Sequence, residues 1–155
     1  MSEKYMQAAI DEAYRGIRKG EGGPFGAVIV KDGKIIGKCH NTVLKGNDPT
    51  KHAEMNAISA VSRKLKNYVL SGCTIYSTTE PCPMCFSAIH WARIDKLVFG
   101  TKIQDVRKLG FNELAISAKR MKTLGRSPLV VESGFMRGEC IALLKEWKKL
   151  EGKTY

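Results

Sequence analysis

Two short segments of the 155-residue chain constrain its fold more than any other feature, because their side chains suit a single metal ion. The first is His52-Ala53-Glu54, and the second carries Cys82 and Cys85, which have two residues between them. One imidazole and two thiolates supply three of the four ligands of a tetrahedral zinc ion, and a catalytic zinc site keeps the fourth position open for water. The fold must therefore bring together two segments that lie far apart in the sequence.

Glu54 is predicted to move protons and not to bind the metal. It lies two residues after His52, so the two side chains point in different directions from a helix. Zinc lowers the pKa of bound water towards neutrality, and a nearby carboxylate can carry the released proton to the substrate. A lone C-x-x-C pair also suits a redox centre or half of a structural zinc site, but neither interpretation uses His52 and Glu54.

Hydrophobic periodicity and turn residues divide the chain into helices and strands. Helices are predicted over residues 2–19, from about 51 to 65, over 81–93, over a segment ending near 124, and over 134–151. Strands are predicted over residues 25–30, 34–40, 73–77, 96–100 and 128–131. This order predicts a single α/β domain over residues 1–155, a three-layer α/β/α sandwich around a five-stranded mixed sheet.

Both candidate metal-binding segments fall at predicted helix starts. His52 follows a proline-containing break, and Pro83 suits the first turn of the helix that begins around Cys82 and Cys85. Free N–H groups at a helix start favour a thiolate over a thiol. We therefore expect two helix N-termini to face each other across one zinc ion.

The composition is that of an ordinary globular protein, with 43% hydrophobic and 26% charged residues. No apolar run approaches the roughly 18 residues of a membrane span. The N-terminus shows no secretory apolar region, so a cytoplasmic location without membrane contact is expected. The odd number of cysteines predicts reduced thiols, and those without metal-site spacing are expected to be small core residues: Cys39, Cys73 and Cys140.

The net charge of +11 is the unusual bulk property, since 26 Lys and Arg residues stand against 15 Asp and Glu residues. Such a charge is compatible with a nucleic-acid substrate. The alternative is a basic surface that serves solubility. The absence of a stripe of interleaved basic and aromatic residues favours this alternative.

The chain resembles the cytidine deaminase-like superfamily from about residue 4 to residue 150. The pattern H-x-E followed by P-C-x-x-C is typical of zinc-dependent base deaminases. The resemblance implies one zinc ion per subunit, a small nucleobase as substrate and a homodimer. Two branches share these motifs: free-base guanine deaminases and transfer-RNA adenosine deaminases. The segments that carry the resemblance are residues 24–30, Asn41, residues 47–54 and residues 80–85.

Four features of the sequence are similar to the guanine deaminase branch: residues 22–28, 88–93, 109–113 and the C-terminal residues 152–155. The resemblance implies that Phe25 stacks on the purine and that Trp91 contributes to the substrate site. It implies that Glu113 assists proton transfer and that Asn41 hydrogen-bonds the edge of the base. It also implies that Tyr155 closes the site, on a C-terminal helix and tail exchanged between subunits.

Each of these residues has an ordinary structural alternative. Phe25 and Trp91 suit core aromatics, Glu113 suits an exposed helix start, and Tyr155 suits a frayed terminus. Glu113 also departs from the guanine deaminase pattern, which has an aspartate at this position, beside a second acid where this chain has Asn112. A longer carboxylate there is compatible with another aminated heterocycle, such as a triazine, a pterin or a guanine nucleoside.

The sequence therefore predicts zinc-dependent hydrolysis of guanine to xanthine and ammonia. The first alternative is deamination of adenosine in transfer RNA, which the positive charge supports. The second is deamination of another small base or nucleoside, such as cytosine. A zinc scaffold or RNA-binding module without activity is the least economical interpretation, because His52, Glu54, Cys82 and Cys85 are all present.

Overall fold

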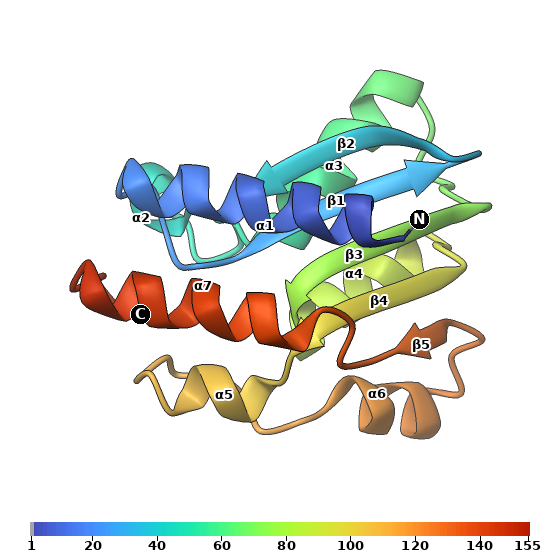
Figure 1. Ribbon diagram of the computed structural model, residues 1–155. Coiled ribbons are helices and arrows are strands. Elements are labelled where there is room, and N and C mark those ends of the chain that lie inside the picture. The colour runs from blue at the N-terminus through green and yellow to red at the C-terminus, as the bar shows by residue number, and fades with distance from the viewer. Residues whose placement is uncertain (1) are drawn as a thin grey trace.

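The protein is described by a computed structural model that covers residues 2–155. Its centre is a five-stranded sheet with the strand order β2-β1-β3-β4-β5 (Figure 1). β1 runs antiparallel to both β2 and β3, whereas β3, β4 and β5 are parallel. The predicted mixed sheet is thus confirmed. Its strands are β1 (Gly26–Lys31), β2 (Lys34–His40), β3 (Cys73–Thr79), β4 (Lys96–Thr101) and β5 (Val130–Glu132).

Helices cover both faces of this sheet, which confirms the predicted three-layer sandwich. α1 and α7 lie on one face, and α3 and α4 lie on the other (Figure 1). The described helices are α1 (Glu3–Arg18), α2 (Val43–Gly46), α3 (Ala53–Leu65), α4 (Pro83–Trp91), α5 (Ile103–Arg107), α6 (Ala118–Gly125) and α7 (Arg137–Lys149).

The alternation of side chains along the strands explains why both faces are covered. In β1, Ala27 and Ile29 pack towards α3 and α4, while Val28 and Val30 pack towards α1. All four are buried, so this strand has no solvent-facing side. A continuous apolar strand of this kind requires helices on both of its faces.

Two short helices, α2 and α5, were not predicted. They have four and five residues, which is too short for a helical period to appear in the sequence. β3 extends two residues beyond its predicted end, because Thr79 still pairs with Thr101 of β4. The other boundaries differ by a few residues, which is the usual uncertainty of helix ends.

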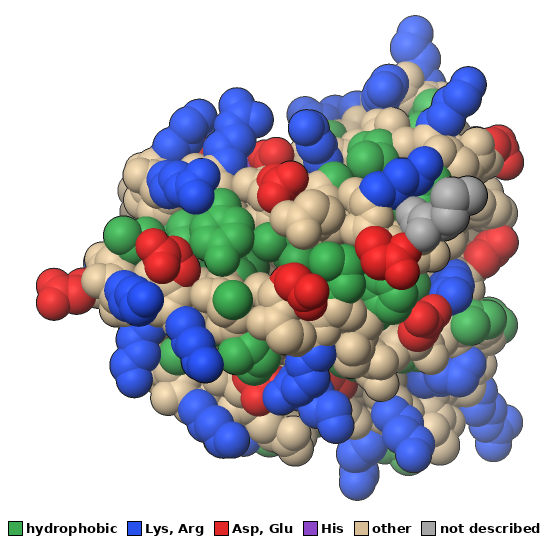
Figure 2. Space-filling model, viewed as in Figure 1, with side chains coloured by type: hydrophobic (Ala, Val, Ile, Leu, Met, Phe, Trp, Pro, Cys, Tyr) green, Lys and Arg blue, Asp and Glu red, His purple; other side chains and the backbone are tan. Residues whose placement is uncertain are grey.

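The cysteines outside the candidate metal site are free thiols, as predicted. Cys73 and Cys140 are buried in the core, and Cys39 is partly buried against it. No helix within residues 2–155 has the length and apolarity needed to cross a membrane. Figure 2 shows Lys and Arg side chains scattered over one face of the molecule, with Asp and Glu between many of them.

We predict that Gly26→Ala destabilises the protein by roughly 1–3 kcal/mol, the usual cost of overpacking. An added Cβ at Gly26 would lie 2.0 Å from the carbonyl oxygen of Ala9, so α1 would have to move off the sheet. The measurement is the free energy of unfolding in urea. Gly138→Ala is the control, because a Cβ there meets nothing within 4 Å. Equal stability of the two variants would contradict this account of α1 packing.

Candidate active site

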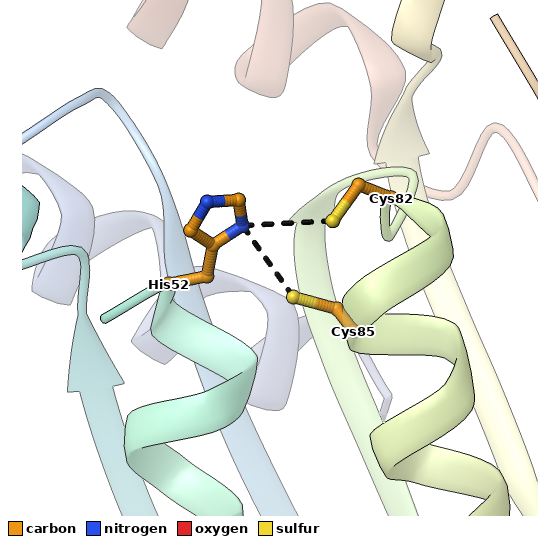
Figure 3. A group of neighbouring side chains, drawn as sticks. All are labelled: His52, Cys82 and Cys85. Carbon is orange, nitrogen blue, oxygen red and sulfur yellow. Dashed lines mark hydrogen bonds between the residues drawn. The ribbon is translucent and has the colours of Figure 1, made fainter. Parts of the chain in front are cut away.

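The candidate active site lies where β3 ends and where α3 and α4 begin (Figure 3). His52 is the N-cap residue of α3, and Cys82 is the N-cap residue of α4. Both have extended backbones, and Pro83 occupies the first turn of α4. The structure thus brings the three predicted ligands together at two facing helix N-termini.

The spacing of the ligand atoms fits a tetrahedral zinc ion. His52 Nδ1 lies 3.7 Å from the sulfur of Cys82 and 3.5 Å from that of Cys85 (Figure 3). Tetrahedral bonds of about 2.3 Å to sulfur and about 2.05 Å to nitrogen place such atoms roughly 3.6 Å apart. All three ligand atoms lie within 4.8 Å of one another. The donor set and its geometry therefore suit zinc with one coordination position left for another ligand.

The two thiols have opposite acidities. A hydrogen bond with Cys85, together with one from His52, lowers the pKa of Cys82 well below that of a free thiol. The same bond with Cys82, reinforced by burial, raises the pKa of Cys85. One thiolate and one thiol thus share a proton, and this proton would be released when a metal ion binds both sulfurs.

Glu54 is buried beside this site, at 6% exposure. The hydroxyl of Ser77 on β3 donates to Glu54 Oε1 at 3.0 Å and holds the carboxyl in place. Burial raises the pKa of Glu54, because a carboxylate loses hydration there. A carboxyl group with a raised pKa and a fixed orientation is suited to accept and return a proton.

Glu113 lies in the loop between α5 and α6 and reaches the same site. It borders a small cavity together with Phe25, His52, Glu54 and other residues. Burial, followed by the nearby charge of Cys82, raises the pKa of Glu113 to about 7. A bound zinc ion would act in the opposite direction, because positive charge stabilises a carboxylate. The structure does not place Glu113 at a helix start.

Tyr155 lies beside the site within the same chain. Its ring packs edge-on against Phe111 at 5.1 Å and lies 6.4 Å from the ring of His52. Its carbonyl oxygen accepts a hydrogen bond from the backbone N–H of Asn112 at 3.1 Å. The tail is therefore anchored, and Tyr155 is not a frayed end. Exchange of the tail between subunits stays a prediction.

Asn41 and Phe25 lie next to each other because β1 and β2 pair at Gly26 and His40. Asn41 is fully buried, and its Oδ1 accepts backbone N–H groups from Gly23 and Val43. Its Nδ2 donates to the hydroxyl of Tyr155 at 2.5 Å. The amide is thus locked in orientation, with its donor side turned towards Tyr155.

The cavity bordered by Phe25, His52, Glu54 and Glu113 has a volume of only about 20 Å³. That is room for about one water molecule and is too small for a nucleobase. Binding of a base therefore requires side chains around the site to move from the described positions.

Trp91 is not brought to the site within this chain. It is the last residue of α4, which begins directly after Cys82, and eight residues of helix span roughly 12 Å. Its side chain is 77% exposed, so it is not a core aromatic residue either. It borders a separate surface cavity with His90 and Pro128. A contribution of Trp91 to the substrate site stays a prediction.

Sequence reasoning missed Glu80, which lies between β3 and Cys82. Its buried carboxyl accepts the backbone N–H of Ile103 at 3.0 Å and that of Ala118 at 2.8 Å. These bonds hold the first turns of α5 and α6, and with them the loop that carries Glu113. The sequence feature that could have identified Glu80 is its position directly before the Pro-Cys-Pro-Met-Cys segment.

We predict that Cys85→Ala removes zinc binding, because two remaining protein ligands hold the metal much more weakly than three. The measurement is zinc content per chain by mass spectrometry after purification and dialysis. Cys39→Ala is the matched control, since Cys39 lies outside the ligand group. Undiminished zinc in Cys85→Ala would contradict the proposed ligand set.

Known proteins that are similar to this chain include deaminases of two kinds. The guanine deaminase of Bacillus subtilis (strain 168) is 44% identical over 111 residues, which are 72% of this chain and 71% of that protein. The tRNA-specific adenosine deaminase of Aquifex aeolicus (strain VF5) is 48% identical over 97 residues, 63% of this chain and 64% of that protein.

Solved structures are similar over nearly the whole chain. A guanine deaminase from Nitrosomonas europaea matches with a TM-score of 0.88 and 29% identity, covering 96% of this chain and 85% of that chain. A structure from work on A-to-I editing by tRNA:A34 deaminases matches with a TM-score of 0.79 and 31% identity, covering 92% and 99%. Residues 1–101 match the family described as the cytidine and deoxycytidylate deaminase zinc-binding region. With its His-Cys-Cys group in place at the start of two helices, the chain belongs to this zinc-dependent deaminase family.

Proposed function

We propose that the protein is a guanine deaminase that hydrolyses guanine to xanthine and ammonia. The observation that carries this proposal is the confined site, in which Tyr155 lies beside His52 and contacts Asn41. A site that closes over its substrate suits a free base. A base still attached to RNA would need an open path for the polynucleotide. The similarity to two guanine deaminases supports the same substrate.

The metal and Glu54 divide the chemistry between them. Zinc bound by His52, Cys82 and Cys85 would supply Lewis-acid activation of a water molecule. Glu54 takes the proton of that water and delivers it to a ring nitrogen of the base. Its buried position and its hydrogen bond from Ser77 keep it aimed at the reacting atoms. Addition of the water oxygen to the amino-bearing carbon of the base then makes the amine a leaving group.

Glu113 completes the proton transfer. A carboxyl group can accept and return protons, and burial raises the pKa of Glu113 while a bound zinc ion would lower it. It sits beside Glu54 at the same cavity, so it can help protonate the departing amine. Glutamate reaches farther than aspartate, and the loop held by Glu80 sets how far its backbone stands from the site.

Recognition of the base falls to Phe25 and Asn41. Phe25 packs edge-on against Phe111 at 5.2 Å, which fixes the ring that would stack on the purine. Asn41 Nδ2 bonds to Tyr155 in the closed state, and an acceptor on the base can take its place when the tail opens. A buried polar group discriminates strongly against a base that leaves it unpaired. We propose no contact of Trp91 with the base within one chain.

Deamination of adenosine in transfer RNA is the second candidate. The similarity to tRNA-specific adenosine deaminases and the net charge of +11 favour it. This candidate requires RNA binding that weakens steeply with salt. A homodimer, as the sequence predicts, is compatible with both functions and stays a proposal.

The proposal is tested by ammonia release from a panel of substrates. Guanine, guanosine, adenine, cytosine, cytidine, ammeline and a transfer-RNA anticodon stem-loop are incubated separately with zinc-loaded protein. We expect rapid turnover of guanine and little or none of the others. Turnover of the stem-loop alone would replace this proposal with the second candidate.

We predict that Glu54→Gln keeps the zinc and the fold but lowers kcat by about 10²–10⁴-fold, the usual contribution of a proton-transfer group. The amide has nearly the same shape as the carboxyl but cannot accept the water's proton. Zinc content and the melting temperature serve as controls. Near-normal turnover with a full complement of zinc would show that another group carries the proton.

We predict that removal of Thr154 and Tyr155 raises KM for guanine or abolishes activity, because the closed site then opens to water. Tyr155→Phe is the finer comparison, since it keeps the ring against Phe111 and loses only the bond to Asn41. Its effect should be smaller than that of the truncation. Kinetic constants of the truncated protein that match the wild type would dismiss the role of the tail.

A further inference from the structure

His40 lies at the end of β2 between two glutamates that none of the deaminase motifs include. Its Nδ1 is 2.8 Å from Oε1 of Glu12, and its Nε2 is 2.6 Å from Oε2 of Glu21. The side chains of His40, Glu12 and Glu21 are only 11%, 8% and 14% exposed. The three side chains form a largely buried bridge. In the sequence, His40 precedes Asn41, whereas the zinc ligands follow it.

Both ring nitrogens of His40 take part in the bridge. Each nitrogen lies within hydrogen-bonding distance of a carboxylate oxygen, so the ring is held at both of its polar positions. A hydrogen bond from His40 lowers the pKa of Glu21, which agrees with an ionised acceptor. Two positively charged side chains lie near these carboxylates: Arg15 is 3.9 Å from Glu12, and Lys45 is 3.7 Å from Glu21.

The three bridged residues belong to different parts of the fold. Glu12 lies on α1, and Glu21 begins the turn that leads to Phe25. The His40 ring lies against α1, since a Cβ on Gly16 would come within 2.5 Å of it. The bridge thus ties α1, the turn and the end of β2 together at one point.

Both residues assigned to base binding are connected directly to this bridge. Asn41 follows His40, and its backbone N–H donates to the carbonyl of Phe25 at 3.1 Å. The backbone N–H of Gly23, within the turn, donates to Oδ1 of Asn41 at 3.3 Å. A shift of Glu21 or His40 would therefore reach both the stacking ring and the amide.

We propose that His40, held between Glu12 and Glu21, is a positioning residue that sets Phe25 and Asn41 for binding the base. This inference depends on the proposed function in one respect: it takes Phe25 and Asn41 as the residues that bind the base. His40 touches neither the metal ligands nor Glu54 among the contacts of residues 2–155. Its loss should therefore weaken substrate binding much more than the chemical step.

The kinetic test compares His40→Gln with His90→Gln. Glutamine at position 40 can satisfy one carboxylate but turns its own oxygen towards the other. We expect KM to rise roughly tenfold, as for loss of one charged hydrogen bond, with kcat changed less than about threefold. His90→Gln should leave both constants unchanged, since His90 lies on α4 beside Ser127. An unchanged KM in a folded His40→Gln protein would overturn the proposal.

A second variant keeps the test decisive if His40→Gln folds poorly. In the double variant His40→Gln with Glu21→Gln, the new amide at position 40 can donate to Glu12 and accept from the new amide at position 21. Both links of the bridge return without any charge on residue 40. We expect the KM of this double variant to lie close to that of the wild type, and a KM raised roughly tenfold in the folded double variant would overturn the positioning role.

Nuclear magnetic resonance of ¹⁵N-labelled histidine tests the bridge without any substrate. We expect the Nε2 signal of His40 to shift in the Glu21→Gln variant, because this change replaces the group bonded to that nitrogen. An Nε2 signal that keeps its wild-type position would overturn the bridge. This measurement is independent of guanine turnover, and the kinetic constants are taken with whichever base the wild type deaminates. Failure of the guanine assignment is thus distinguishable from failure of the bridge.

Discussion

His52 Nδ1 and the sulfurs of Cys82 and Cys85 meet within 4.8 Å at the start of two helices, and the remainder of the site is arranged around this meeting. β3 delivers the cysteine segment to the same edge of the sheet at which α3 begins. Because α3 and α4 pack against one face of the sheet, their N-termini face each other. The peptide N–H groups there favour a thiolate, and the pKa of Cys82 is lowered before metal binds, whereas the bond with Cys82 and burial raise the pKa of Cys85.

Buried carboxyl groups then build the site outward from the metal ligands. Glu54 is aimed by Ser77, while Glu80 binds two backbone N–H groups and anchors the loop that holds Glu113. These three carboxyl groups have three different roles because their surroundings differ. Glu80 has both oxygens satisfied by backbone donors and is structural. Glu113 is partly buried without comparable donors among the contacts of residues 2–155, and burial raises its pKa to about 7 in the absence of metal.

In the proposed function, closure of the site depends on segments that lie far apart in the sequence. Asn41 and the turn before Phe25 would form one wall, and the tail with Tyr155 would form the cover. Gly152 allows the tail to lie close to Trp147, since a Cβ at that position would come within 2.2 Å of the indole ring. The bridge of His40 with Glu12 and Glu21 contacts the same wall from outside. Substrate access and substrate fit would therefore be governed by different contacts.

The sequence by itself determined the zinc ligands as a candidate group, the mixed sheet and the order of its main elements. These follow from local patterns: residue type, short spacing and hydrophobic period. The tertiary structure alone decided which distant residues join the site. It placed Tyr155 against Asn41 and Glu80 against the first N–H groups of α5 and α6. It also left Trp91 exposed at the far end of α4. Such contacts depend on how helices and loops pack in three dimensions. No periodicity along the chain records them, and α2 and α5 are too short to show a period at all.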